Sequence, residues 1–214
     1  MTMLSARLRE LGIEPLHMEA VKDDPTVMSE KLKEAAETAD MIVTTGGVSV
    51  GKKDIMHESL RLMGAERIFW RVKMKPGMPT LFSAYKKTSD ITATDNCASE
   101  REIPIISLSG NPFGVAVSIE LLIRPALEKM MQDPSIGLKE VNGIMADNFE
   151  KGIKGRRFIR AYLENGKFHL PNGLHSNGVL SSMAGCNCLI DTKTMENQES
   201  RSLNAGDKVG AILL

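Results

Sequence analysis

The sequence predicts an α/β fold: a three-layer α/β domain with a mostly parallel sheet, followed by a small C-terminal β domain. Two observations predict the first domain. β-type apolar runs alternate with helical patterns, and glycine-rich loops follow several of these runs. Strands that alternate with helices pair in parallel through right-handed crossovers, which place helices on both faces of the sheet. The third observation is that short β-type runs with turn signals replace the helical patterns near the middle of the chain. We therefore expect the α/β domain at residues 1–134 and the β domain at residues 135–214.

Each element of the α/β domain follows from a local pattern. Leucines at helical spacing stop at Gly12, which predicts a first helix with a glycine C-cap. Asp24 before Pro25 predicts the N-cap and first turn of the second helix. Asp54 is expected to cap the third helix, and Pro125 to bend or restart the last one. The predicted elements are, in order, a helix ending at 12, a strand over 13–18, a helix over 25–39, a strand over 41–45, a helix over 54–64, strands over 67–74 and 80–85, a surface loop over 86–102, a strand over 104–108 and a helix over 113–131.

The β domain is predicted from turn signals. Asn165-Gly166 lies between two apolar runs, over 158–163 and 168–170, and Asn-Gly in that position is a strong hairpin signal. A last apolar run covers residues 208–214, and no helical pattern follows residue 131. We expect only short strands and turns in this part of the chain.

The charge balance excludes two classes of protein. The chain carries 27 basic and 27 acidic residues, so it lacks the overall charge on which non-specific nucleic-acid binders and membrane-surface binders rely. Its apolar runs fall far short of the roughly 20 residues that a membrane span needs, and its first residues do not resemble a signal peptide. We therefore expect a cytoplasmic protein that binds neither nucleic acid nor membranes.

Cysteines and histidines give no signal of a metal site. The chain has three cysteines, and Cys186 and Cys188 without further ligands fall short of a zinc site. We expect reduced, half-buried structural thiols. The four histidines lack metal-binding spacing.

The loop over residues 44–54 is the first of three candidate binding loops, because α/β sheets bind ligands at the carboxyl ends of their strands. Gly46 and Gly47 would let backbone N–H groups approach an anion, and the hydroxyls of Thr45 and Ser49 could donate to it. The loop matches neither common nucleotide-binding glycine pattern. From spacing alone, a glycine-rich turn without function fits about as well, and Asp54 is equally explained as a helix cap.

Two further loops carry cations or polar groups at strand ends. Strand alternation would place Arg71, Lys73 and Lys75 on one side of the chain, as a cradle for phosphate or an oxyanion; a solvated strand face explains them equally well. In the loop Ser109-Gly110-Asn111-Pro112, the glycine would allow close approach and the asparagine could bind a polar ring edge. The alternative there is a tight turn with a proline at the helix start.

Together these motifs resemble the molybdopterin molybdenumtransferase family, which includes MoeA and the E domain of gephyrin. The resemblance covers nearly the whole chain: the α/β part resembles the Mog-like molybdopterin-binding domain, and residues 138–214 resemble the C-terminal β domain. The matching motifs, in family order, are Asp23-Asp24-Pro25, Thr44-Thr45-Gly46-Gly47-Val48-Ser49-Val50-Gly51 with Asp54, Lys75-Pro76-Gly77-x-Pro79, Leu108-x-Gly110-Asn111-Pro112, Phe158-Ile159-Arg160 and Leu180-Ser181-Ser182.

The resemblance implies an enzyme of molybdenum cofactor biosynthesis that inserts molybdate into adenylylated molybdopterin and releases AMP in a Mg²⁺-dependent step. It implies catalytic roles for Asp54, Lys75 and Asp24, with Asp54 and Asp24 near the metal, and a homodimer in the full-length protein. The residues that it implies for binding the pterin, phosphate or molybdate are Thr45, Gly46, Gly47, Ser49, Val50, Gly51, Arg71, Ser109, Gly110, Asn111 and Pro112.

The chain also departs from the family pattern. The family usually has a proline where Ser109 stands and a lysine where Met78 stands, so one turn is relaxed and one cation is removed. Two N-terminal domains and the first strand of the α/β domain usually precede the part that matches. Two alternatives to an enzyme stay open: a scaffold, as in receptor clustering by gephyrin, and a pterin-binding fragment without turnover.

Overall fold

The computed structural model describes residues 3–49, 51, 54–88, 100–153, 155–172, 178, 180–192 and 201–214, which form two compact units. We call Leu8–Val72 with Pro79–Gly110 the sheet unit, and Met1–Arg7, Lys73–Met78 and Asn111–Leu214 the barrel unit. Each has its own hydrophobic core. The predicted domain boundary at residue 134 divides the chain by sequence position, whereas the two units are defined by contacts. The boundary therefore stays a prediction.

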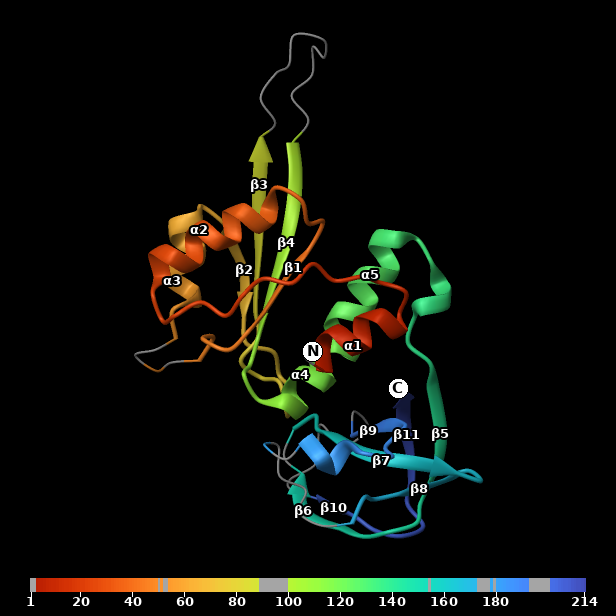
Figure 1. Ribbon diagram of the computed structural model, residues 1–214. Coiled ribbons are helices and arrows are strands. Elements are labelled where there is room, and N and C mark those ends of the chain that lie inside the picture. Colours follow the sequence, from red (N-terminus) through yellow and green to blue (C-terminus); the bar gives the residue numbers. More distant parts are fainter. Residues whose placement is uncertain are drawn as a thin grey trace. The chain divides into compact units, whose positions relative to one another are not determined.

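The sheet unit contains a four-stranded sheet in the order β1-β4-β3-β2 (Figure 1). β1 pairs in parallel with β4, whereas the β4–β3 and β3–β2 pairs are antiparallel. The fold is therefore mixed α/β, and the prediction of a mostly parallel sheet was wrong. Antiparallel neighbours need no helical crossover, and no described helix separates β2 from β3. The strands are β1 (Ile42–Thr45), β2 (Glu66–Trp70), β3 (Leu81–Thr88) and β4 (Glu100–Leu108).

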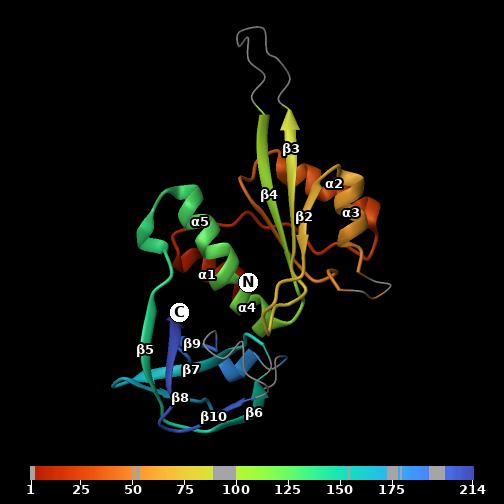
Figure 2. The same cartoon turned by 180° about the vertical axis from the view of Figure 1, so that it is seen from behind.

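Two helices of the sheet unit, α2 (Pro25–Ala36) and α3 (Met56–Met63), lie on one side of the sheet, as Figures 1 and 2 show from opposite directions. The predicted N-cap of α2 is confirmed, because Asp24 Oδ1 accepts from the amides of Thr26 (2.8 Å) and Val27 (3.1 Å). The buried residues that form the core between helices and sheet are Leu32, Ala36, Ile42, Val48, Met56, Leu60, Met63, Leu81, Ile103 and Ile105.

The strand predicted over 13–18 does not form. α1 (Met3–Glu10) is followed by a turn in which the predicted capping residue Gly12 has a φ of +79°, and the chain after it pairs with none of the described strands. Leu16 is 71% exposed and Met18 43% exposed. A β-type sequence becomes a strand only where a neighbour receives its backbone hydrogen bonds, so the local pattern alone was misleading.

The other strand boundaries also shift. The strand predicted over 67–74 ends at Trp70, because Arg71 has a φ of +72° and cannot continue an extended chain. The predicted surface loop over 86–102 was wrong at both ends: β3 continues to Thr88 and β4 begins at Glu100. Lys86 and Glu102 lie opposite each other in the antiparallel register of these two strands.

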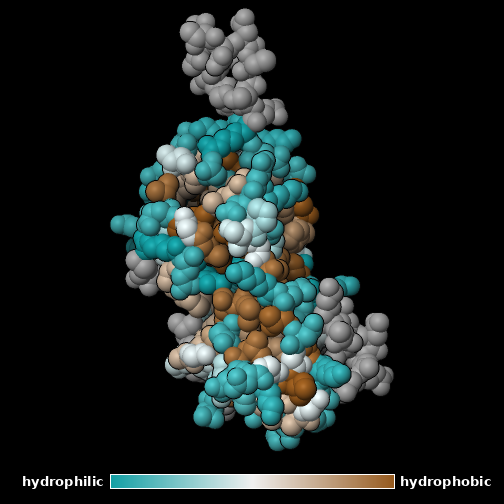
Figure 3. All heavy atoms as spheres, turned by 90° about the vertical axis from the view of Figure 1, so that its right-hand side faces the viewer, coloured by the Kyte–Doolittle hydropathy of each residue, from teal (hydrophilic) through white to brown (hydrophobic). Residues whose placement is uncertain are grey.

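The barrel unit contains a closed five-stranded barrel in the order β11-β5-β8-β7-β9, with β6 and β10 as a separate pair. The β7–β8 hairpin turns at Asn165 (φ +50°) and Gly166 (φ +76°), which confirms the predicted Asn-Gly turn. Figure 3 shows polar and apolar side chains on the face that carries α5 and β5. The strands are β5 (Glu140–Met145), β6 (Phe149–Ile153), β7 (Phe158–Glu164), β8 (Lys167–His169), β9 (Cys188–Asp191), β10 (Arg201–Leu203) and β11 (Lys208–Leu213).

A long helical segment in three parts also belongs to the barrel unit. α4 (Pro112–Ser118) is followed by a π-helical segment (Ile119–Ile123) and α5 (Arg124–Met131). The α-helix thus restarts beside Pro125, as predicted, since a proline lacks the amide that the regular pattern needs. No helix in the described part of the chain is both long and apolar enough to cross a membrane.

Candidate functional site

The loop that follows β1 and contains Gly46, Gly47 and Gly51, which we call the glycine loop, lies beside the loop after β4 in the sheet unit. β1 and β4 are parallel neighbours, so their carboxyl ends share one edge of the sheet. The Gly46 amide donates to the Leu108 carbonyl at 2.9 Å, and a Cβ added to Gly110 would lie 3.6 Å from the Gly46 Cα. The structure therefore brings together two of the three loops that the sequence singled out.

Glycine is required in the first loop by its backbone. Gly46 and Gly47 have φ values of +89° and +68°, which side chains disfavour. A Cβ at Gly47 would lie 3.3 Å from the Met56 Cγ, and the Gly47 carbonyl accepts from the Met56 amide at 3.1 Å. At Gly46, by contrast, a Cβ would meet no described atom within 4 Å. The loop is thus tied to α3 on one side and presents bare backbone on the other.

Ser109 adds a buried hydroxyl to the same edge. The residue is 8% exposed, and its Oγ has no hydrogen-bond partner within the described ranges. Leaving such a group unpaired costs about 1–3 kcal/mol, which a ligand oxygen or N–H group would offset. Thr45 and Ser49 are exposed, whereas Val50, also a predicted binding residue, lies outside the described residues.

The two predicted metal-binding carboxylates both accept from backbone amides. Asp24 caps α2, as described above, and Asp54 accepts from the amide of Gly51, which closes the glycine loop. The sequence predicted that Asp54 caps α3. That prediction was wrong, because the N-cap position is Ile55. Among the residues that the structure describes, no group of three or more His, Cys, Asp or Glu side chains could hold a metal ion.

Arg71 lies in the sheet unit, against the ring of Trp70. Its guanidinium carbon is 4.2 Å from the centre of the ring, and the Trp70 Nε1 donates to the Val48 carbonyl in the glycine loop at 3.0 Å. Its own amide donates to the Thr80 carbonyl at 2.8 Å. Because of the positive φ at Arg71, the alternation predicted for Arg71, Lys73 and Lys75 does not hold.

Lys75 lies in the barrel unit, where its backbone joins β7. Its amide donates to the Arg156 carbonyl at 3.0 Å and its carbonyl accepts from the Phe158 amide at 2.8 Å. Nearby, a Cβ at Gly77 would lie 2.9 Å from the Ser118 Oγ of α4. The loop of Lys75 is therefore fixed by the β strand and the helix together, while its side chain is exposed.

Asn111 and Pro112 also belong to the barrel unit. The Asn111 Oδ1 accepts from the Gly114 amide at 3.1 Å and caps α4, with Pro112 in the first turn. The structure thus supports the tight-turn alternative for these two residues. The amide nitrogen of Asn111 and the second lone pair of its Oδ1 remain to act on a ligand.

Arg160 in β7 is a candidate that sequence reasoning did not select. It is 1% exposed, its guanidinium carbon lies 4.1 Å from the centre of the Phe113 ring, and it donates to the Ser182 Oγ. Burial lowers the pKa of this guanidinium. The available signal was an arginine inside a β-type apolar run, where a charge is unusual.

The two described cysteines are free thiols beside this arginine's strand. Burial raises the pKa of Cys186 and raises that of Cys188 to about 12. Both shifts favour the protonated thiol over the reactive thiolate, and Cys188 is buried whereas Cys186 is partly exposed.

Comparison with known families and proteins gives consistent matches along the chain. Residues 1–129 match the family model described as a probable molybdopterin binding domain, and residues 142–214 match that of the MoeA C-terminal region (domain IV). The molybdopterin molybdenumtransferase of Staphylococcus aureus (strain Mu50) is 30% identical in an alignment that covers 99% of this chain and 46% of that protein. The protein of the same name from Bacillus subtilis (strain 168) is 27% identical over 88% of this chain and 41% of its own length.

Solved structures give the same fold. A molybdopterin biosynthesis moeA protein from Pyrococcus horikoshii OT3 has a TM-score of 0.69 at 23% identity, over 99% of this chain and 45% of that chain. A molybdenum cofactor biosynthesis protein from Pyrococcus furiosus has a TM-score of 0.70 at 21% identity, over 99% of this chain and 63% of that chain. This chain spans less than half the length of the two molybdenumtransferases. With one family model matching residues 1–129, more than half of the chain, and a second matching residues 142–214, the chain belongs to the molybdopterin molybdenumtransferase (MoeA) family.

Proposed function

We propose that this chain is part of a cytoplasmic enzyme of molybdenum cofactor biosynthesis, which inserts molybdate into adenylylated molybdopterin and releases AMP. The observation that carries the proposal is the edge of the sheet at the ends of β1 and β4. There the bare backbone of Gly46, the close approach of Gly110 and the unpartnered buried hydroxyl of Ser109 lie together. Such an edge suits a ligand that brings phosphate oxygens close to the backbone.

The sheet unit would bind the phosphate end of the pterin. Backbone amides of Gly46 to Gly51 and the hydroxyls of Thr45, Ser49 and Ser109 would donate to its oxygens, with Val50 part of the same loop. Arg71 would add a positive charge, and Gly110 would leave room for the ligand. In the barrel unit, Lys75 would bind molybdate or phosphate, with Asn111 and Pro112 shaping the loop after β4.

The carboxylates of Asp54 and Asp24 are the type of ligand that Mg²⁺ prefers. Mg²⁺ is commonly held by one or two carboxylates together with substrate oxygens and water, and a carboxylate that accepts one amide can still bind a cation through its other lone pairs. When bound, the ion would neutralise charge on the phosphoanhydride. Asp54, which the Gly51 amide orients, would be its principal protein ligand, with Asp24 as the second. We also propose domains at 1–134 and 135–214 and a homodimer in the full-length protein.

The proposal is tested with Ser109→Ala and, as a matched control, Ser107→Ala. Both hydroxyls are buried in or next to β4 and have no partner among the described residues, so removing either should leave stability unchanged or slightly raised. Ser109 directly follows the last residue of β4, in the loop that would meet the ligand, whereas Ser107 lies within the strand between Thr44 and Leu81. Affinity for adenylylated molybdopterin should therefore fall about tenfold in Ser109→Ala, the loss of one hydrogen bond, and stay unchanged in Ser107→Ala.

Turnover is measured in parallel as AMP release with Mg²⁺ and molybdate. Release that depends on molybdate supports the enzyme. Binding of the pterin without AMP release would identify a pterin-binding chain without turnover, and absence of binding would overturn the proposal.

A further inference from the structure

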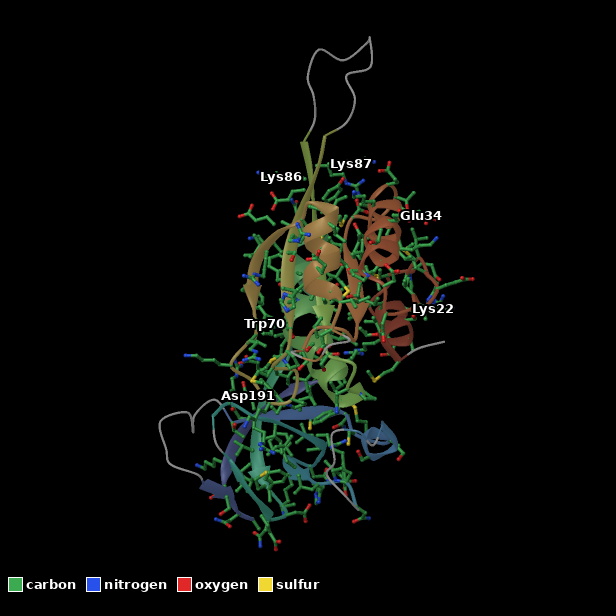
Figure 4. The ribbon with its side chains drawn as sticks, turned by 90° about the vertical axis from the view of Figure 1, so that its left-hand side faces the viewer. Lys22, Glu34, Trp70, Lys86, Lys87 and Asp191 are labelled. Atoms are coloured by element: carbon green, nitrogen blue, oxygen red, sulfur yellow. The ribbon has the colours of Figure 1, made fainter. Side chains whose placement is uncertain are left out.

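Trp70 links the glycine loop to Arg71. It is the single tryptophan of the chain and lies at the end of β2, where Figure 4 labels it. Its indole N–H donates to the Val48 carbonyl, its ring carries the Arg71 guanidinium, and the edge of the His57 ring from α3 meets it at 4.7 Å between centroids, with the planes at 86°. The Trp70 side chain therefore contacts two other segments of the sheet unit, the glycine loop and α3, as well as the residue that follows it in the chain.

The conformation of Arg71 favours this stacked arrangement. A φ of +72° is unfavourable for arginine and ends β2 at Trp70. The conformation is held by the hydrogen bond from the Arg71 amide to the Thr80 carbonyl and by the contact of the guanidinium with the ring. A cation over a tryptophan face is the most favourable cation–π pair.

The charge of Arg71 is available to a ligand. Its side chain is exposed, and no ion pair among the described residues involves it. A guanidinium that stacks on a ring keeps its N–H groups in its own plane, where they can donate to an anion. Stacking thus reduces the freedom of the side chain without using its donors.

The same ring fixes the glycine loop. The Val48 side chain is 2% exposed in the core, so the loop is held from within by packing and from outside by the indole N–H. Val48 directly follows Gly46 and Gly47, whose backbone faces the proposed phosphate position. A shift of the indole would therefore move the loop and Arg71 together.

We infer that Trp70 is a positioning residue, which holds the Arg71 guanidinium and the glycine loop in one arrangement for the phosphate groups of the ligand. The inference rests on the proposed function, because it names how that site binds a phosphoanhydride. The Trp70 side chain donates its only N–H group to the loop, so Trp70 acts through Arg71 and the loop backbone.

The test compares three variants of the chain by calorimetric titration with adenylylated molybdopterin. Trp70→Leu removes ring and N–H and should weaken binding about tenfold; Trp70→Phe keeps a ring for Arg71 and should weaken it about threefold. Phe69→Leu is the control, since Phe69 is the neighbouring aromatic residue of β2 and packs on Phe82 at 5.4 Å between ring centres. Binding by Phe69→Leu should equal that of the parent chain.

A double-mutant cycle with Arg71→Gln separates positioning from mere stability. If Trp70 acts through Arg71, Trp70→Leu should weaken binding much less in the Arg71→Gln background than in the parent. Equal losses in both backgrounds, or parent-like binding by Trp70→Leu, would overturn the inference and leave the proposed function standing. If Trp70→Leu fails to fold, the cycle is run with Trp70→Phe, for which the same two outcomes decide. A parent chain that does not bind the pterin would instead overturn the proposed function.

Discussion

At the scale of single residues, Asp54 tests whether the glycine loop uses a negative charge. Its carboxylate accepts from the Gly51 amide, a bond that the neutral side chain of Asn can also accept. We predict that Asp54→Asn lowers Mg²⁺-dependent AMP release much more than it lowers pterin binding, because only cation binding needs the charge. Release is measured against Mg²⁺ concentration, and binding by titration. A variant that loses only thermal stability would show that Asp54 merely closes the loop.

His57 provides a prediction on pH. Burial lowers the pKa of His57, the charge of Arg67 lowers it further, and Asp54 acts in the opposite direction. Its Nε2 is buried without a partner in the described part of the chain. Because the folded-state pKa lies below the ordinary value of 6.5, the unfolded chain binds more protons between the two values, and stability falls as the pH falls through that range.

This pH dependence can be measured by chemical unfolding between pH 7 and pH 5. In the parent chain the unfolding free energy should decrease towards pH 5. His57→Phe keeps an aromatic ring near Trp70 but does not titrate, so its profile should be flatter. Parallel profiles for the two proteins would mean that other groups cause the dependence.

At the scale of elements, the π-helical segment carries a buried ionic group. Glu120 is 1% exposed and pairs with Arg7 at 2.7 Å and with Arg124 at 2.9 Å, and Arg124 also donates to the Ile136 carbonyl at 2.5 Å. The carboxylate thus joins its own π-helical segment to α1 and α5, and Arg124 extends the connection to the turn at Ile136. If this carboxylate were neutral, the buried Arg124 and the partly exposed Arg7 would both lose its negative charge.

We predict that Glu120→Gln destabilises the barrel unit by about 3–5 kcal/mol. The control is Glu34→Gln, whose partner Lys31 lies on the exposed face of α2 at 2.6 Å, and which should cost about 0–1 kcal/mol. Both values come from denaturant unfolding. Similar small losses for the two variants would indicate that water or local rearrangement compensates the buried charges.

The elements also show what the sequence could predict. Signals that act within a few residues were correct: Asp24 as a cap, the Asn165-Gly166 turn and the restart beside Pro125 all depend on local backbone chemistry. Strand pairing was not predicted correctly, because it depends on partners that are distant in the sequence. The segment at 13–18 and the antiparallel β3–β4 pair were mispredicted for that reason.

The candidate site divides in the same way. The glycine loop and the loop at Ser109 were predicted from residue types, and parallel pairing of β1 with β4 places them together. Arg71 and Lys75 looked like one cradle in the sequence, but the positive φ at Arg71 breaks the alternation, and the two belong to different compact units. Arg160 could not be predicted as a site residue, because its burial and its contacts with Phe113 and Ser182 depend on the folded barrel.

At the scale of the whole molecule, ligand binding should appear as added stability. A ligand that binds only the folded state stabilises it by RT ln(1 + [L]/Kd), about 2.7 kcal/mol at one hundred times Kd. For a chain of this size each kcal/mol raises the melting temperature by roughly 2–4 °C. We predict a rise of roughly 5–10 °C with adenylylated molybdopterin and Mg²⁺ at that concentration. The transition that includes the sheet unit should move, because the glycine loop belongs to it.

Gly47→Val shows whether this rise comes from the glycine loop. The substitution places a branched side chain at a φ of +68°, within reach of Met56, so we expect a lower melting temperature, a recognisable fold and no rise with ligand. Gly12→Val is the matched control, since Gly12 also has a positive φ (+79°) in the sheet unit but lies in the turn after α1. It should be destabilised as well and yet retain the full rise. If both variants keep the rise, the ligand binds elsewhere, whereas loss of the rise in Gly47→Val alone assigns the binding energy to the loop that joins β1 to α3.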